Sequence, residues 1–194
     1  MEEPAVVPVS RFAVICHPHP QAGGTLHNKV VHTLARTFQE LGVPSLRFNF
    51  RGVGKSAGEF DNGNGETEDA LAVIEWGRTR WPGARFWLAG FSFGAFVALK
   101  ASARLTPERL ITIALPVQRF EFAPLRPPSC PWLLIQGDQD EIVDARSVLA
   151  WAEQLSPMPD IVTLPGVGHF FHGRLQELKD AVIQHTRDQS ATTH

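Results

Sequence analysis

The stretch Gly90-Phe91-Ser92-Phe93-Gly94 indicates how the whole chain is organised. It lies between an apolar run at 85–89, which predicts a buried strand, and a longer apolar run at 93–103, which predicts a buried helix. Ser92 then occupies a sharp strand-to-helix turn, the setting that a nucleophile elbow requires. Glycine suits both flanks of such a turn, because strand and helix approach closely there. The turn would expose the Ser92 hydroxyl at a helix N-terminus, where developing negative charge is stabilised.

Strand and helix patterns alternate along the rest of the chain. The predicted strands are 11–16, 44–50, 85–89, 110–114, 132–136 and 161–164, and most are continuously apolar, as in parallel strands covered on both faces. The predicted helices are 28–41, 67–78, 93–104, 144–155 and 174–186. Residues 52–65 and 115–131 are rich in turn residues or proline and predict irregular segments. The pattern therefore predicts a doubly wound, mostly parallel α/β sheet of about six strands.

Size and composition favour one domain that spans residues 1–194. The chain has 194 residues and a mass of 21.4 kDa, 43% of its residues are hydrophobic and 20% are charged. A net charge of −2 without a long basic block gives no reason to expect nucleic acid or an anionic membrane as a partner. The first ten residues carry Glu2 and Glu3 instead of a basic and apolar signal, so we expect a cytoplasmic protein.

A serine hydroxyl is a poor nucleophile near neutral pH, so it needs a base and a group that orients the base. The strand at 132–136 is followed by Gly137-Asp138-Gln139-Asp140, and the last strand by Gly166-Val167-Gly168-His169. Groups just past the carboxyl ends of parallel strands gather along one edge of a sheet. The chain order serine, acid, histidine is that of the α/β-hydrolase fold.

These motifs resemble those of the small, lidless bacterial serine α/β-hydrolases, relatives of the dienelactone-hydrolase and esterase groups. The resemblance covers nearly the whole chain and rests on segments 16–20, 23–25, 28–31, 48–56, 90–94, 137–143 and 168–171. It implies that Ser92 is the nucleophile, Asp140 the acid and His169 the base, with no cofactor. In the family pattern the acid is the third residue after the glycine that closes the strand, which favours Asp140 over Asp138. We expect Asp138 to be a turn residue that binds its own backbone.

Acyl transfer also needs N–H donors for the oxyanion. Phe93, directly after the nucleophile, supplies the first. The loop His17-Pro18-His19-Pro20 can supply the second only through a histidine, because proline has no N–H. We expect His17 to end the strand, which leaves the main chain of His19 as the second donor.

Two other interpretations of the motifs are weaker. His17, His19, His169 and His172 could suggest a metal, but their spacings match no common zinc pattern, and we expect none. Gly52-Val53-Gly54-Lys55-Ser56 resembles the end of a phosphate-binding loop, but position 49 is Asn49, where that motif needs glycine. Arg51 is then expected to brace the loops of the site.

The resemblance also predicts how open the site is. Lids in this fold usually follow the strand that here is 110–114, and only 115–131 is available, so the site should be shallow and suited to small or short-acyl esters. Six phenylalanines could either form apolar walls of the site or pack in the core: Phe91, Phe93, Phe120, Phe122, Phe170 and Phe171. Thioester, lactone or peptide cleavage on the same triad, and a non-catalytic binding module, remain alternatives.

The beginning of the chain departs from the family pattern. Two extra strands usually form an antiparallel edge, but only about ten residues precede the strand at 11–16. That edge is therefore expected to be lost or covered by a partner, because a bare strand edge invites pairing. The protein is accordingly expected to be a monomer or a homodimer.

Overall fold

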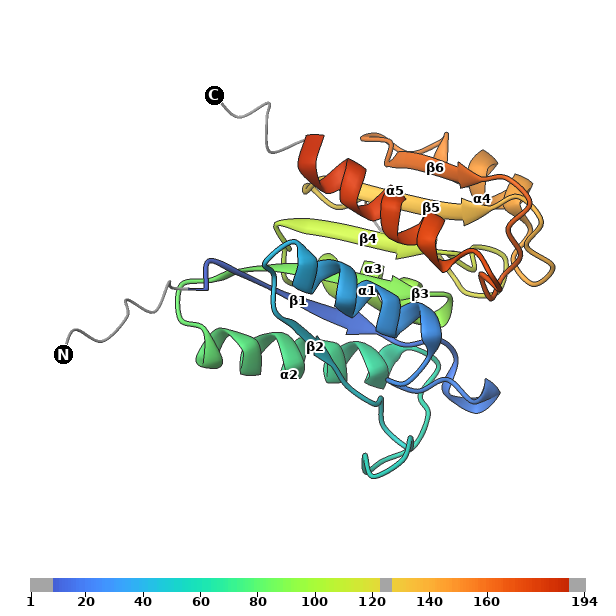
Figure 1. Cartoon of the computed structure of the whole chain (residues 1–194). Helices are drawn as coiled ribbons and strands as arrows, with labels where there is room; N and C mark the ends of the chain where they lie inside the picture. The colour runs from blue at the N-terminus through green and yellow to red at the C-terminus, as the bar shows by residue number, and fades with distance from the viewer. Residues whose placement is uncertain (1–8, 123–126, 189–194) are drawn as a thin grey trace.

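The computed structural model describes residues 9–122 and 127–188. Its sheet has six parallel strands in the order β2-β1-β3-β4-β5-β6. The strands are β1 (Arg11–Cys16), β2 (Ser45–Arg47), β3 (Arg85–Phe91), β4 (Arg109–Ile113), β5 (Trp132–Gly137) and β6 (Asp160–Leu164). Because all strands run in one direction, the loops that follow them lie at one end of the sheet (Figure 1).

Helices cover both faces of the sheet. They are α1 (Lys29–Glu40), α2 (Asn64–Arg80), α3 (Phe93–Ser102), α4 (Ala145–Ala152) and α5 (Leu175–Asp188). Helices α1 and α5 lie side by side on the face turned toward the viewer in Figure 1, and they share one apolar cluster with that face of the sheet. Helices α2, α3 and α4 share the cluster on the opposite face. The predicted doubly wound α/β fold is thereby confirmed.

Several predicted elements have different bounds, and two of these differences lie around the loop after β2. The strand expected at 44–50 is reduced to β2, because the chain then leaves the sheet and the Phe50 N–H donates to His17 Nε2 at 3.1 Å. The helix expected at 67–78 begins three residues earlier, at Asn64, so the irregular segment predicted at 52–65 ends sooner. Glu66 accounts for the early start, since its carboxylate accepts the Gly63 N–H at 2.8 Å and caps the helix.

In the described residues, no extra element is added before β1 or between β4 and β5. In the described residues no strand precedes β1, so β2 is a sheet edge only three residues long. Whether a partner covers this edge stays a prediction. No helix or strand occurs between β4 and β5 in the described residues, which confirms that no cap domain is inserted there. The expectation of no secretory signal concerns residues that lie mostly outside the described ranges.

Candidate active site

Ser92 occupies the turn between β3 and α3, with φ of 54° and ψ of −120°. A left-handed φ at a residue other than glycine costs about 1–3 kcal/mol, so the surrounding structure must impose it. The two glycines allow this: a Cβ on Gly90 would lie 2.1 Å from the Gly94 oxygen, and one on Gly94 would lie 2.3 Å from the Cys16 oxygen. The Ser92 N–H is fixed by the Ile113 oxygen at 2.8 Å. The packing therefore matches the turn that the sequence predicts.

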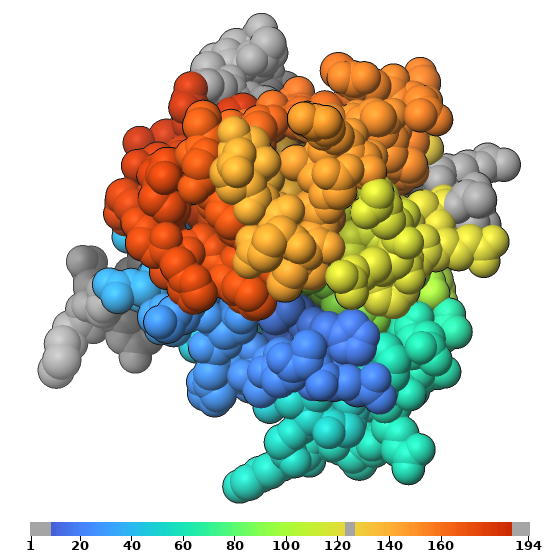
Figure 2. Space-filling model, turned by 90° about the vertical axis from the view of Figure 1, so that its right-hand side faces the viewer, coloured from blue at the N-terminus to red at the C-terminus, as the bar shows by residue number. Residues whose placement is uncertain are grey.

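Figure 2 views the molecule from the end at which the strands finish, where the blue loop near residue 20 meets the orange loops near 140 and 170. A cavity of about 340 Å³ opens there. Its lining includes Ser92, His19, Phe93 and His169. Four of the five predicted site residues thus line one cavity, although they come from three distant parts of the sequence.

The fifth residue, Asp140, lies behind His169. Its Oδ2 is 2.8 Å from His169 Nδ1, and the two side chains are only 1% and 4% exposed. An ionised carboxylate can only accept hydrogen bonds, so His169 Nδ1 carries a proton, and in the neutral imidazole the lone pair is on Nε2. Phe91 and Phe170 each lie 5.1 Å from the His169 ring, centroid to centroid. The imidazole is thus held in one orientation with a basic nitrogen.

Asp140 is ionised in spite of its burial. Burial would raise the pKa of this carboxyl, but hydrogen bonds from His169 and from the N–H groups of Val143 and Ile142 together lower the pKa below its ordinary value. These two N–H groups reach Asp140 Oδ1 at 2.7 and 2.9 Å, and Gln136 Nε2 reaches Oδ2 at 3.2 Å. The carboxylate is fixed by backbone on one oxygen and faces His169 with the other.

Asp138 lies at the same strand end but points elsewhere. Its Oδ1 accepts the Gly166 N–H at 2.7 Å, and the residue is exposed. The expected bond to its own backbone is therefore wrong: Asp138 joins the loop after β5 to the loop after β6. Only Asp140, of the two aspartates, contacts His169.

Two backbone N–H groups near Ser92 are available to a ligand. Within the described part of the chain, neither the His19 N–H nor the Phe93 N–H donates to a protein acceptor. Their side chains are in contact, with ring centroids 5.1 Å apart. These are the donors that the sequence predicts for an oxyanion.

His17 differs from the prediction, because β1 ends at Cys16 and His17 already belongs to the loop. It is fully buried, its Nδ1 lies 2.7 Å from the Pro18 oxygen and its Nε2 accepts the Phe50 N–H. Burial lowers the pKa of His17 to about 4, although the bond to Pro18 acts in the opposite direction. A neutral His17 therefore ties the loop of His19 to the chain that follows β2.

The phenylalanines divide between wall and core. Phe93, Phe120 and Phe170 line the cavity, and Phe170 is 46% exposed. Phe91, Phe122 and Phe171 are buried outside the lining. The site thus has an apolar wall on several sides.

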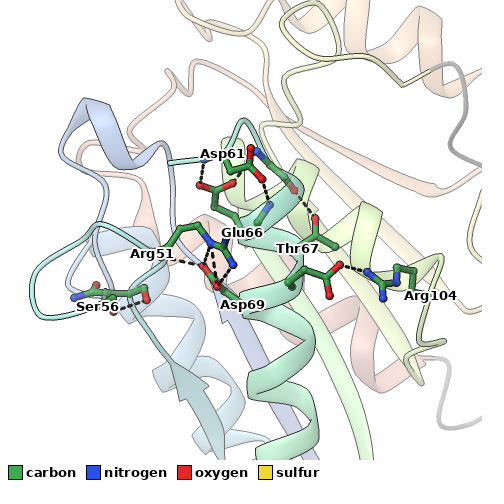
Figure 3. A network of polar contacts seen from close by, with 11 residues as sticks. Arg51, Ser56, Asp61, Glu66, Thr67, Asp69 and Arg104 are labelled. Carbon is green, nitrogen blue, oxygen red and sulfur yellow. Dashed lines mark hydrogen bonds and ion pairs between the residues drawn. The ribbon is translucent and has the colours of Figure 1, made fainter. Parts of the chain in front are cut away.

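The loop after β2 carries a separate polar network (Figure 3). Arg51 Nη2 pairs with Asp69 Oδ1 at 2.8 Å, and the Arg51 N–H donates to Asp69 Oδ2 at 2.9 Å. Glu66, fully buried, accepts the N–H groups of Asp61 and Gly63, both at 2.8 Å. Segment 52–56 is followed by loop and not by a helix, so no helix N-terminus is offered to a phosphate.

Some residues around the site carry no sequence signal. Glu141 Oε2 accepts the His169 N–H at 3.1 Å and fixes the backbone of the loop. Arg119 lines the cavity from the irregular segment after β4. Glu141 lies in the 137–143 segment but has no role assigned there, Arg119 belongs to no motif, and the fold brings both to the site.

Neither a metal cluster nor a membrane-spanning helix occurs in the described residues. No group of three or more His, Cys, Asp or Glu side chains within ranges 9–122 and 127–188 could hold a metal ion. Over the same ranges, no helix has the length and apolar character needed to cross a membrane.

Comparison with known proteins agrees with this geometry. Residues 13–115 match the family described as serine aminopeptidase, S33. A serine α/β-hydrolase without lid from Xanthomonas campestris is 49% identical, covers 96% of this chain and 85% of its own, and superimposes with a TM-score of 0.90. An α/β serine hydrolase homologue from Coxiella burnetii is 47% identical, with 94% and 88% covered and a TM-score of 0.89.

A further protein is similar in sequence over most of this chain. An uncharacterized protein of Rickettsia prowazekii is 37% identical over 189 residues, which cover 92% of this chain and 79% of that protein. Sheet order, turn and missing lid define the class of lidless α/β-hydrolases. The chain belongs to the serine α/β-hydrolase family that the S33 match describes.

Proposed function

We propose that the protein is a carboxylesterase for small or short-acyl esters, with Ser92 as nucleophile, His169 as base and Asp140 as the acid that orients it. One observation carries the proposal: Ser92, at its strained turn, lines the same cavity as His169, whose Nδ1 is held by buried Asp140. Nucleophile, base and orienting group are the three parts that acyl transfer by a serine needs.

The reaction begins when Ser92 Oγ attacks the ester carbonyl carbon and His169 Nε2 takes the hydroxyl proton. The oxyanion of the tetrahedral intermediate accepts hydrogen bonds from the N–H groups of Phe93 and His19. As the intermediate collapses, His169 returns the proton to the leaving alcohol and the acyl group stays on Ser92. Water, activated by His169, then releases the carboxylic acid. Every step uses groups of this chain, and no cofactor enters.

The lining of the cavity favours ester over aminopeptidase chemistry. An aminopeptidase has to bind the substrate's α-ammonium group, for which a carboxylate is the usual partner. No Asp or Glu belongs to the described lining, and the permanent charge on it, Arg119, is positive. Thioester and lactone cleavage use the same steps, so they remain alternatives on the same triad. A non-catalytic binding module would not need an oriented base, so the His169–Asp140 pair disfavours that alternative.

The proposal is tested with p-nitrophenyl esters from acetate to dodecanoate, for wild type and Ser92→Ala. We expect turnover to be highest for the short chains and lost in the variant. A thioester and a γ-lactone tested in parallel show which bond is cleaved best. Equal activity of wild type and Ser92→Ala would contradict the assignment of Ser92. Faster cleavage of the thioester than of the esters would contradict the ester as the substrate class and favour a thioesterase.

A further inference from the structure

One cation stands at the mouth of the cavity without a carboxylate partner. Of the described lining residues, Arg119 alone has a permanent charge. Its side chain is exposed, and within residues 9–122 and 127–188 no Asp or Glu oxygen lies within ion-pair distance of it. By contrast Arg11, Arg51, Arg85, Arg104 and Arg174 all pair with carboxylates.

The backbone around Arg119 is held in place. The Arg119 N–H donates to the Pro116 oxygen at 3.0 Å in a tight turn. The next residue, Phe120, stacks on Phe96 with centroids 4.5 Å apart and an interplanar angle of 14°. Arg119 Nη2 makes a long bond, 3.4 Å, to the Ile142 oxygen. The backbone of Arg119 is therefore fixed beside the site, and most of the five N–H donors of its guanidinium are left available.

Its charge acts inside the site. Burial is the main reason that the pKa of His19 is lowered, and the charge of Arg119 contributes in the same direction, while Glu66 opposes both. The nearby acids are already engaged: Glu66 binds two N–H groups, and Glu141 binds the His169 N–H. A substrate carboxylate at the mouth would thus meet a cation that forms no ion pair with any carboxylate of the described residues.

We propose that Arg119 selects esters that carry a second, free carboxylate, so that the substrates are half-esters of dicarboxylic acids or esters of hydroxy acids. The inference rests on the proposed esterase function. A guanidinium binds a carboxylate through two parallel hydrogen bonds, which fixes orientation as well as charge. Phe120 and Phe170 give the cavity apolar wall, suited to the carbon chain between the two carboxyl groups. Hydrolysis of such a half-ester by water yields the dicarboxylic acid and the alcohol.

The test compares monoethyl succinate, glutarate and adipate with neutral ethyl esters of the same chain length, in a pH-stat. Acetoxyacetate is added as the substrate whose carboxylate lies on the alcohol side. We expect wild type to prefer the anionic esters, and Arg119→Gln to lower that preference about five- to twenty-fold, mainly through KM, because the contact is similar in ground and transition state. The preference should also shrink as salt is added.

Two variants control the experiment. Arg36→Gln removes the same charge from an exposed position on α1, away from the cavity lining, and should leave the preference unchanged. Arg119→Lys keeps the charge but not the paired donors and should fall between wild type and Arg119→Gln. The same ratio of anionic to neutral turnover in wild type, Arg119→Gln and Arg36→Gln would overturn the inference while leaving the esterase proposal intact.

A binding measurement separates the two proposals if no ester is turned over. Calorimetry of monoethyl adipate with Ser92→Ala, alone and combined with Arg119→Gln, reports the carboxylate contact without catalysis. Weaker binding in the double variant supports the role of Arg119, and equal binding contradicts it. Absent turnover with Arg119-dependent binding would count against the esterase proposal alone.

Discussion

The loops after β1 and β3 differ from the loop after β2 in what they leave unpaired. Around Ser92, the N–H groups of His19 and Phe93 have no protein acceptor in the described residues, and the Ser92 hydroxyl has no protein partner there either. Where the loop after β2 meets helix α2, the buried carboxylate of Glu66 is matched by two N–H donors of the loop, and Arg51 of the loop by Asp69 of the helix. Both regions are rich in glycine and polar groups, but only one keeps hydrogen-bonding capacity free.

The difference separates residues that we expect to act in the reaction from residues that stabilise the fold. A buried polar network stabilises a fold when all its members are satisfied, whereas a catalytic site needs donors that wait for charge developed during the reaction. Changes at the Ser92 site should therefore alter turnover with little effect on stability. Changes in the network of Figure 3 should do the opposite.

The largest effect is expected from Ser92→Ala. Loss of the nucleophile should lower kcat by about 10⁴-fold or more. The free energy of unfolding should change by less than about 1 kcal/mol, because the deleted hydroxyl has no protein partner among the described residues. Turnover assays check the loss of activity, and urea unfolding checks the change in stability. A strongly destabilised variant would show that Ser92 also supports the fold.

Asp140→Asn should come next, with turnover lowered about 10³- to 10⁴-fold, because an amide no longer stabilises the charged imidazole and can hold His169 in the wrong tautomer. Asp138→Asn is the matched control. Its amide oxygen can still accept the Gly166 N–H, so activity should stay near that of wild type. Reversed effects of the two substitutions would transfer the role of acid to Asp138.

Glu66→Ala should act on stability. It leaves the N–H groups of Asp61 and Gly63, of which the second is buried, without their acceptor, which should lower the free energy of unfolding by about 2–4 kcal/mol. Glu68→Ala on the same helix removes only an exposed ion pair with Arg104 and should cost less than about 1 kcal/mol. Turnover of folded Glu66→Ala should fall far less than in Ser92→Ala. Equal stability of the two glutamate variants would remove the contrast between the regions.

His17 gives a smaller, pH-dependent effect. In the unfolded chain it binds a proton near pH 6.5, whereas the buried side chain, with its pKa lowered to about 4, stays neutral. The unfolded state then binds more protons, so the free energy of unfolding should fall by up to about 3 kcal/mol as pH drops from 6.5 to 4. Urea unfolding of wild type and His17→Gln at pH 7.0 and 4.5 measures this loss of stability. A loss of the same size in His17→Gln would assign the pH dependence to other groups.

Sequence was sufficient for the centre of the sheet, because β1, β3, β4 and β5 are buried on both faces and therefore almost continuously apolar. It was less informative where tertiary contacts decide: the strand after Val43 is cut short by the bond from Phe50 to His17, and α2 starts early because Glu66 caps it. The positions of Ser92, Asp140 and His169 at one end of the sheet could be predicted, because each follows a strand end with glycine nearby. Glu141 and Arg119 could not, since an acidic or basic residue in a loop carries no signal until the fold places it.

The most direct test of the account is covalent labelling with a fluorophosphonate, followed by mass spectrometry of the digested protein. The reagent reports an activated serine beside an oxyanion site and is independent of the natural substrate. We predict one adduct on the peptide that contains Ser92, formed rapidly in wild type, slowly in Asp140→Asn and not at all in Ser92→Ala. An unlabelled wild-type protein, or an adduct on another serine, would contradict the account.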